Sequence, residues 1–198
     1  NYPTNNTMNP PTTRLSSNYF ATLNSKVKEL QARGADVIRL DIGSPDLPPA
    51  PHIIAALQKS AQNPGHHGYT PHQGSEELRS AWAEMYRRVH GVVINPQNVV
   101  PLLGSKEGVF HLSQAILNPG DGVLIPDPSY MTYAQGAHFA QAEVAKVPLL
   151  PENDYLPDLS AIPVEIARRA KILWLNYPNN PTTAMATLDF FREVIEFA

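Results

Sequence analysis

A short turn of small residues, Gly104-Ser105-Lys106, separates an apolar run from a segment with helical periodicity. Free backbone N–H groups and the positive end of the helix dipole make a helix N-terminus a natural anion site. Ser105 adds a hydroxyl donor, Lys106 adds a cationic amine, and Gly104 lets the backbone approach an oxygen closely. The segment is therefore a candidate phosphate site, although Gly-Ser before a helix is more often only a turn and an N-cap.

Two further candidate residues follow apolar runs that we interpret as strands. Tyr130 comes after residues 122–126, and Asn180 comes after residues 171–175. Ligands of open parallel sheets bind beyond the carboxyl ends of the strands. The Tyr130 ring suits stacking on a planar ligand, and it equally suits packing under a loop. The Asn180 amide suits donation to a ligand, and it equally suits an Asx turn in a segment stiffened by Pro178 and Pro181.

The elements that must position these residues alternate between helix and strand in the second half of the chain. Near-continuous apolar strands separated by helices predict an α/β fold with a mostly parallel sheet covered on both faces. We expect an extended arm over residues 1–18, part of a small domain over 19–60, and the N-terminal part of a large α/β domain over 61–198. The predicted helices are 19–33, 52–62, 75–90, 106–117, 131–141, 164–169 and 190–198, and the predicted strands are 37–41, 99–103, 122–126, 143–147 and 171–175.

Composition narrows the class of protein. The 198 residues carry a net charge of −3 and no cysteine, which argues against nucleic-acid binding, disulfides and Cys-ligated metal. The histidines at 66, 67 and 72 lack metal-ligand spacing, so we expect no metal site. No apolar run reaches the roughly 20 residues that span a bilayer, and the composition fits a cytoplasmic protein. Asn1 and the uncapped final helix predict that this sequence is a fragment.

Residues 176–182, Asn-Tyr-Pro-Asn-Asn-Pro-Thr, resemble the Asn-Pro-Thr-Gly turn of the class I/II aminotransferases, fold-type I enzymes that use pyridoxal 5'-phosphate (PLP). The resemblance implies that Asn180 hydrogen-bonds the phenolic oxygen of PLP and that Tyr130 stacks on its ring. It also implies that Ser105 and Lys106 hold the phosphate, which argues against a Schiff-base role for Lys106. Thr183 departs from the family's glycine, and a β-branched residue disfavours positive φ there.

Two other segments extend the resemblance over about residues 38–183. Residues 40–46, Leu-Asp-Ile-Gly-Ser-Pro-Asp, resemble the family's Gly-x-Pro-Asp signature, which implies that Gly43 contacts the substrate carboxylate. Residues 68–79 resemble a segment whose tyrosine, here Tyr69, reaches the PLP phosphate of a neighbouring subunit. The implied protein is a homodimer with shared active sites. Lys106, Tyr130 and Asn180 would contact the substrate as well as the cofactor.

The implied activity is transfer of an amino group between an amino acid and a 2-oxo acid. Residues 147–159 resemble those of LL-diaminopimelate aminotransferases, which points to LL-diaminopimelate and 2-oxoglutarate. A PLP-dependent C–S lyase on the same fold and a non-catalytic cofactor-binding or dimerisation fragment are the alternatives. The family's Schiff-base lysine is expected beyond Ala198, so no catalytic residue is assigned within this chain.

Overall fold

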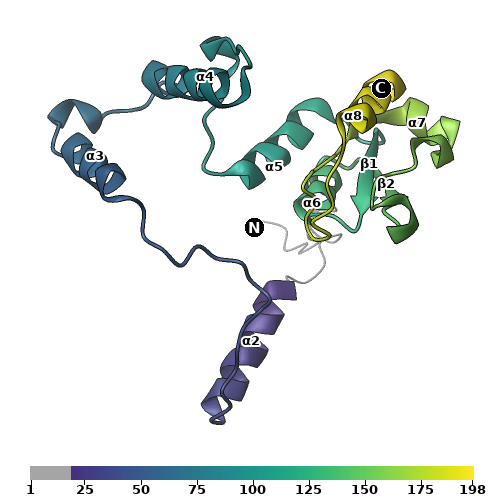
Figure 1. The fold of residues 1–198 in the computed structure, drawn as a ribbon, viewed down its shortest axis with the longest axis horizontal. Helices are drawn as coiled ribbons and strands as arrows, with labels where there is room; N and C mark the ends of the chain where they lie inside the picture. Colours follow the sequence, from purple (N-terminus) through teal and green to yellow (C-terminus); the bar gives the residue numbers. More distant parts are fainter. Residues whose placement is uncertain (1–18) are drawn as a thin grey trace, which may run out of the picture. The chain divides into compact units, whose positions relative to one another are not determined.

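The computed structural model describes residues 19–198 as helices and a parallel sheet (Figure 1). The arm predicted over residues 1–18 lies outside the described residues. Contacts group the described chain into two compact units, Leu102–Ala198 and the preceding residues up to Pro101.

The preceding unit is helical, and the ends of its helix α4 are set by local sequence. Ser75 is the N-cap residue of α4, and its hydroxyl accepts a hydrogen bond from the Leu78 N–H at 3.2 Å. Gly91 ends the same helix with φ +68°, in the left-handed region that glycine enters at little cost. The helix predicted over residues 75–90 is confirmed. The elements are α2 (Tyr19–Ala32), α3 (Pro51–Ala61), η1 (Pro64–His66), α4 (Glu76–His90) and η2 (Pro96–Asn98).

The unit Leu102–Ala198 is built on a parallel sheet with strand order β2-β1-β3. The central strand β1 pairs with β2 from Gly122↔Glu143 to Asp127↔Pro148, and it pairs with β3 on its other side. All three carboxyl ends therefore meet at one edge, as the sequence predicts. The elements are α5 (Ser105–Ile116), β1 (Gly122–Asp127), α6 (Thr132–Phe139), β2 (Glu143–Pro148), η3 (Pro151–Asn153), η4 (Leu159–Ala161), α7 (Val164–Arg169), β3 (Ala170–Leu173) and α8 (Leu188–Phe197).

Apolar side chains cover both faces of this sheet. Val123 and Ile125 belong to a buried cluster that includes Ala137 of α6. Leu124, between them in sequence, belongs to a second buried cluster against which Phe197 of α8 packs. Successive strand residues point to opposite faces, so one short strand serves both clusters. This arrangement confirms the predicted α/β fold with helices on both faces.

Two of the predicted strands are wrong. Residues 37–41 and 99–103 form no strand, and the only sheet of the described residues is β2-β1-β3. Val99 does have extended backbone angles, φ −100° and ψ 126°. An apolar extended run becomes a strand only when a neighbouring chain supplies ladder hydrogen bonds. Within residues 19–198 neither run has such a neighbour, and Leu40 and Leu103 are 94% and 98% exposed.

Within residues 19–198 no helix has the length and apolar character that crossing a membrane requires. The same residues contain no cluster of three or more His, Cys, Asp or Glu side chains arranged to hold a metal ion.

Candidate functional site

The turn before α5 combines a positive-φ glycine with the N-terminus of a helix. Gly104 is the N-cap residue, with φ +108°, which an L side chain rarely adopts. Ser105 opens the helix, and both Ser105 and Lys106 are exposed. The carboxylate of Glu107 accepts a hydrogen bond from the Leu103 N–H at 2.7 Å. That bond engages the negative charge of the first turn with the preceding loop, while the side chains of Ser105 and Lys106 make no hydrogen bond to the described residues.

The structure brings Lys106 and Tyr130 together. The Lys106 Nζ lies 5.8 Å from the centre of the Tyr130 ring, within the range of a cation–π contact. Tyr130 follows β1 and is half-buried, so one part of its ring is packed while the rest is accessible. A cationic amine and an aromatic face are thus adjacent at the carboxyl edge of the sheet.

An aromatic chain ties this edge to β3. The Tyr130 and Tyr133 rings meet edge-to-face at 5.9 Å, and the Tyr133 and Trp174 rings stack at 5.0 Å. Burial raises the pKa of the Tyr133 hydroxyl, with a smaller contribution from Tyr130. The Trp174 Nε1 is buried and has no hydrogen-bond partner among residues 19–198. Sequence reasoning missed Trp174, because an aromatic residue in an apolar strand reads as ordinary core.

The turn after β3 uses two neighbouring asparagines differently. Asn179 is buried, and its Nδ2 donates to the Thr182 Oγ1 at 2.8 Å. Asn180 is exposed, and its amide makes no hydrogen bond with the described residues. The Asx-turn alternative for Asn180 is therefore not what holds this turn. Sequence reasoning also missed Asn179, whose only signal was its position beside the motif asparagine.

Tyr177 connects this turn to the loop after β2. Its hydroxyl donates to the Tyr155 carbonyl oxygen at 2.9 Å, and burial raises the pKa of Tyr177 to about 12. Its ring packs edge-on against Phe190 and Phe191 of α8. The turn that carries Asn180 is therefore anchored to both neighbouring segments.

Thr183 adopts the backbone conformation that glycine would take, with φ +61°. Its N–H donates to the Asn179 carbonyl oxygen at 2.7 Å, so the turn closes despite the β-branched side chain. Left-handed backbone costs an L residue about 1–2 kcal/mol. We expect Thr183→Gly to raise the free energy of unfolding by about 1 kcal/mol, since part of that gain is offset by a more flexible unfolded chain.

Urea denaturation of the two proteins measures this difference. Thr182→Gly is the matched control and should lower stability, because the Thr182 Oγ1 accepts the hydrogen bond from Asn179. A Thr183→Gly protein less stable than the parent would show that the threonine side chain is needed at this position.

Gly43 and Tyr69 lie in the unit that precedes Leu102. Gly43 follows α2 in an irregular segment, and no atom of the described residues lies within 4 Å of the place where a Cβ would stand. Tyr69 follows η1 with its side chain fully exposed. Both residues are thus free for contacts outside their own unit, whereas Lys106 and Tyr130 are already in contact.

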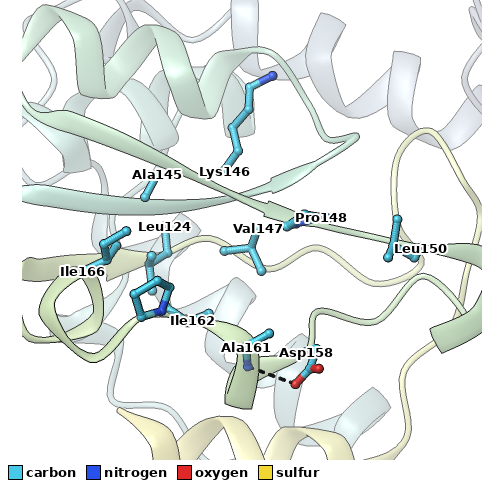
Figure 2. A pocket seen from close by; sticks show the side chains of 11 residues that line it. Leu124, Ala145, Lys146, Val147, Pro148, Leu150, Asp158, Ala161, Ile162 and Ile166 are labelled. Carbon is cyan, nitrogen blue, oxygen red and sulfur yellow. Dashed lines mark hydrogen bonds between the residues drawn. The ribbon is translucent and has the colours of Figure 1, made fainter.

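A cavity of about 200 Å³ lies on the sheet face covered by η4 and α7 (Figure 2). Its lining is mainly apolar, with Leu124, Val147 and Ile162 prominent in Figure 2. Lys146 is directed away from the apolar lining, and its amine pairs with the Asp127 carboxylate at 2.9 Å. This cavity offers no free cation to a phosphate. None of the six site residues predicted from sequence lines it.

Comparison with known proteins gives a consistent family. The sequence profile described as aminotransferase class I and II matches residues 35–198. LL-diaminopimelate aminotransferase from Dehalococcoides mccartyi is 49% identical over 180 residues, which are 90% of this chain and 46% of that protein. The apo structure of BacF from Bacillus subtilis is 42% identical with a TM-score of 0.91, covering 97% of this chain and 49% of that one.

A more distant structure agrees. An aspartate aminotransferase from Thermus thermophilus, carrying a single mutation, is 32% identical with a TM-score of 0.89. The match covers 97% of this chain and 50% of that one. The chain thus spans about half the length of the relatives that it matches.

Proposed function

This chain belongs to the class I and II aminotransferases and has their fold-type I architecture, and on that premise we propose that the intact protein transfers an amino group between an amino acid and a 2-oxo acid. The observation that carries the proposal is the juxtaposition of Lys106 with Tyr130 beside the N-terminus of α5. Phosphate needs cationic and N–H donors, and a pyridine ring needs a flat apolar face. Both are available at one edge of the sheet.

The residues present fit PLP chemically, and PLP is the cofactor of this family. The free N-terminal turn of α5 and the Lys106 amine suit its phosphate, and the accessible part of the Tyr130 ring suits its pyridine. The exposed amide of Asn180 is available to donate to its phenolic oxygen. When bound, PLP supplies an electron sink for the negative charge that develops at the substrate's α-carbon.

In this proposal each of the predicted site residues has a specific role. Ser105 and Lys106 fix the phosphate, which orients the ring. Tyr130 limits the tilt of the ring, and Asn180 stabilises negative charge on the phenolic oxygen. In the same proposal Gly43 brings backbone close to the substrate carboxylate, and Tyr69 donates to the phosphate held by the partner subunit of a homodimer. The domain boundaries expected from sequence, near residues 18 and 60, belong to this proposal as well.

For the substrates we propose LL-diaminopimelate as the amino donor and 2-oxoglutarate as the acceptor. Support comes from the relative of that name, at 49% identity. A C–S lyase is less favoured, because the relative from Dehalococcoides mccartyi and the structure from Thermus thermophilus described above are both named as aminotransferases. The absence of cysteine agrees with a cytoplasmic location.

The test is a coupled assay of the intact protein with PLP, 2-oxoglutarate and a panel of amino donors that includes LL-diaminopimelate and aspartate. Glutamate formation with LL-diaminopimelate as the best donor is the expected result. Pyruvate and thiol release from cystathionine without glutamate formation would favour the lyase. Reversible PLP binding with neither reaction would favour the non-catalytic module.

A further inference from the structure

A three-residue hydrogen-bond cluster joins the end of α3 to η1, the short helix that precedes Tyr69. The Ser60 Oγ lies 2.8 Å from the His66 Nδ1, and the Asn63 Nδ2 lies 3.0 Å from the His66 Nε2. Both ring nitrogens of His66 are therefore engaged, although all three side chains are exposed.

The orientation of Asn63 decides where the proton of His66 lies. The Asn63 Oδ1 accepts a hydrogen bond from the Gly65 N–H at 2.9 Å, which fixes the oxygen on that side. The amide nitrogen of Asn63 must then face His66 and donate to it. The His66 Nε2 is consequently an acceptor, and the proton of the neutral ring is on Nδ1.

His66 therefore donates to Ser60. A serine, a histidine and an asparagine in contact could form a nucleophile with its base. Here, however, the hydrogen bond runs from the histidine N–H to the serine oxygen, which is the opposite of the direction that a base requires. A base must accept the hydroxyl proton, whereas the His66 Nδ1–H is directed at the Ser60 oxygen. The cluster is a brace between α3 and η1.

His67 adds a second hydrogen bond to α3, and this bond responds differently to protonation. The His67 Nε2 lies 3.0 Å from the Ala61 carbonyl oxygen, the last residue of α3, so this nitrogen must be the donor. Protonation leaves that bond intact. Protonation of His66, in contrast, puts hydrogen on both ring nitrogens and removes the acceptor that Asn63 needs.

Tyr69 follows this braced segment by two residues. A pocket beside it is lined by Ser60, His66, Tyr69 and Glu77 among others. The Tyr69 side chain is fully exposed, so its direction depends on the backbone that carries it. We propose that His66 is a positioning residue: in its neutral form it holds the 63–69 loop so that the Tyr69 hydroxyl is presented to a PLP phosphate. This inference rests on the proposed function, which gives Tyr69 that task.

The proposal makes PLP affinity sensitive to acid through one histidine. Imidazoles change charge between about pH 5 and 8. The titratable groups beside His66 are Glu77 and Tyr69 in the pocket and the neighbouring His67. A glutamine at position 66 keeps an N–H donor and an oxygen acceptor but does not titrate. It should maintain the brace at both pH values.

The experiment measures the PLP dissociation constant of the intact protein by absorbance titration, at pH 8 and pH 5.5. The variants are Tyr69→Phe, His66→Ala, the double variant, and His66→Gln. At pH 8 we expect His66→Ala to weaken binding about 3- to 10-fold, the size of one neutral hydrogen bond. On the Tyr69→Phe background the same change should cost less than about 2-fold, because His66 acts through the Tyr69 hydroxyl.

The conservative variant supplies a readout that a general loss of stability does not move. His66→Gln should bind PLP like the parent at pH 8, and it should lose less affinity than the parent at pH 5.5. Acid effects on PLP itself cancel in that comparison. His66→Gln and the pH comparison still test the proposal if His66→Ala fails to fold.

The outcomes separate the inference from its premise. A parent protein that binds no PLP would overturn the proposed function and this inference with it. Unchanged affinity in Tyr69→Phe would remove the role of Tyr69 and therefore the role of His66. Three results would overturn the inference and leave the proposed function standing. The first is weak PLP binding by Tyr69→Phe together with parent-like binding by His66→Ala, and the second is additive effects of the two substitutions on the dissociation constant. The third is an equal loss of PLP affinity at pH 5.5 in the parent and in His66→Gln.

Discussion

Asn180→Ala should weaken PLP binding about 10- to 100-fold, the range expected for a hydrogen bond to a charged group, and leave the free energy of unfolding unchanged. The two effects separate because the Asn180 amide makes no hydrogen bond with the described residues and is exposed. Its removal costs the fold nothing, while in the proposed site the phenolic oxygen of PLP would lose its donor.

Asn179 provides the matched control one residue away. It is 4% exposed and its Nδ2 donates to the Thr182 Oγ1. Asn179→Ala should therefore lower the free energy of unfolding by about 1–3 kcal/mol, because it removes a buried hydrogen bond. Titration with PLP and urea denaturation of both variants give the comparison.

An isosteric variant sharpens the result. Asn180→Asp keeps the shape but places a carboxylate opposite the phenolic oxygen, so it should bind PLP no better than Asn180→Ala. Parent-like affinity in both Asn180 variants, with the fold intact, would exclude Asn180 from the cofactor site.

Gly136→Ala should destabilise the protein by about 1–3 kcal/mol, the usual cost of overpacking a well-packed core. A Cβ on Gly136 would stand 2.6 Å from the Ser113 Oγ and 3.0 Å from the Ser113 Cβ. Ser113 is fully buried in α5, and its hydroxyl donates to the Val109 carbonyl oxygen at 2.9 Å, so it has no room to yield. The contact sets how closely α5 and α6 approach.

The sign of this effect is informative, because helix propensity alone favours alanine over glycine by about 1 kcal/mol. Urea denaturation measures the change. Gly68→Ala is the control: nothing lies within 4 Å of its Cβ position, so it should be close to neutral. Ser113→Gly should restore most of the loss when combined with Gly136→Ala. A Gly136→Ala protein as stable as its parent would mean that the two helices separate readily.

What the sequence predicts well in this chain is what neighbouring residues decide. Ser75 and Gly91 bound α4 because a hydroxyl cap and a left-handed glycine act over one helical turn. The strand 122–126 was recognisable because it is apolar throughout and buried on both faces. Residues 99–103 look the same in sequence. Their backbone is not paired with any strand of residues 19–198, because pairing depends on a partner strand that local sequence does not specify.

The residues of the candidate site also include some that the sequence could predict and some that it could not. Tyr130 could be nominated because it follows a strand, and Lys106 because it lies in the first turn of a helix. The separate roles of Asn179 and Asn180 could not be assigned, since two adjacent asparagines differ only in which one the turn buries. The sequence did not single out His66, because its two hydrogen-bond partners are set by the bend after α3.

The stack of Tyr133 on Trp174 has an optical consequence. The chain contains two tryptophans, and the other, Trp82, lies in the preceding unit and is 48% exposed. Trp174 lies two ring contacts from the face of Tyr130. A bound pyridoxal ring absorbs near the wavelengths at which tryptophan emits, so energy transfer would quench Trp174. If PLP binds at the proposed site, the emission of Trp174 would therefore report cofactor occupancy.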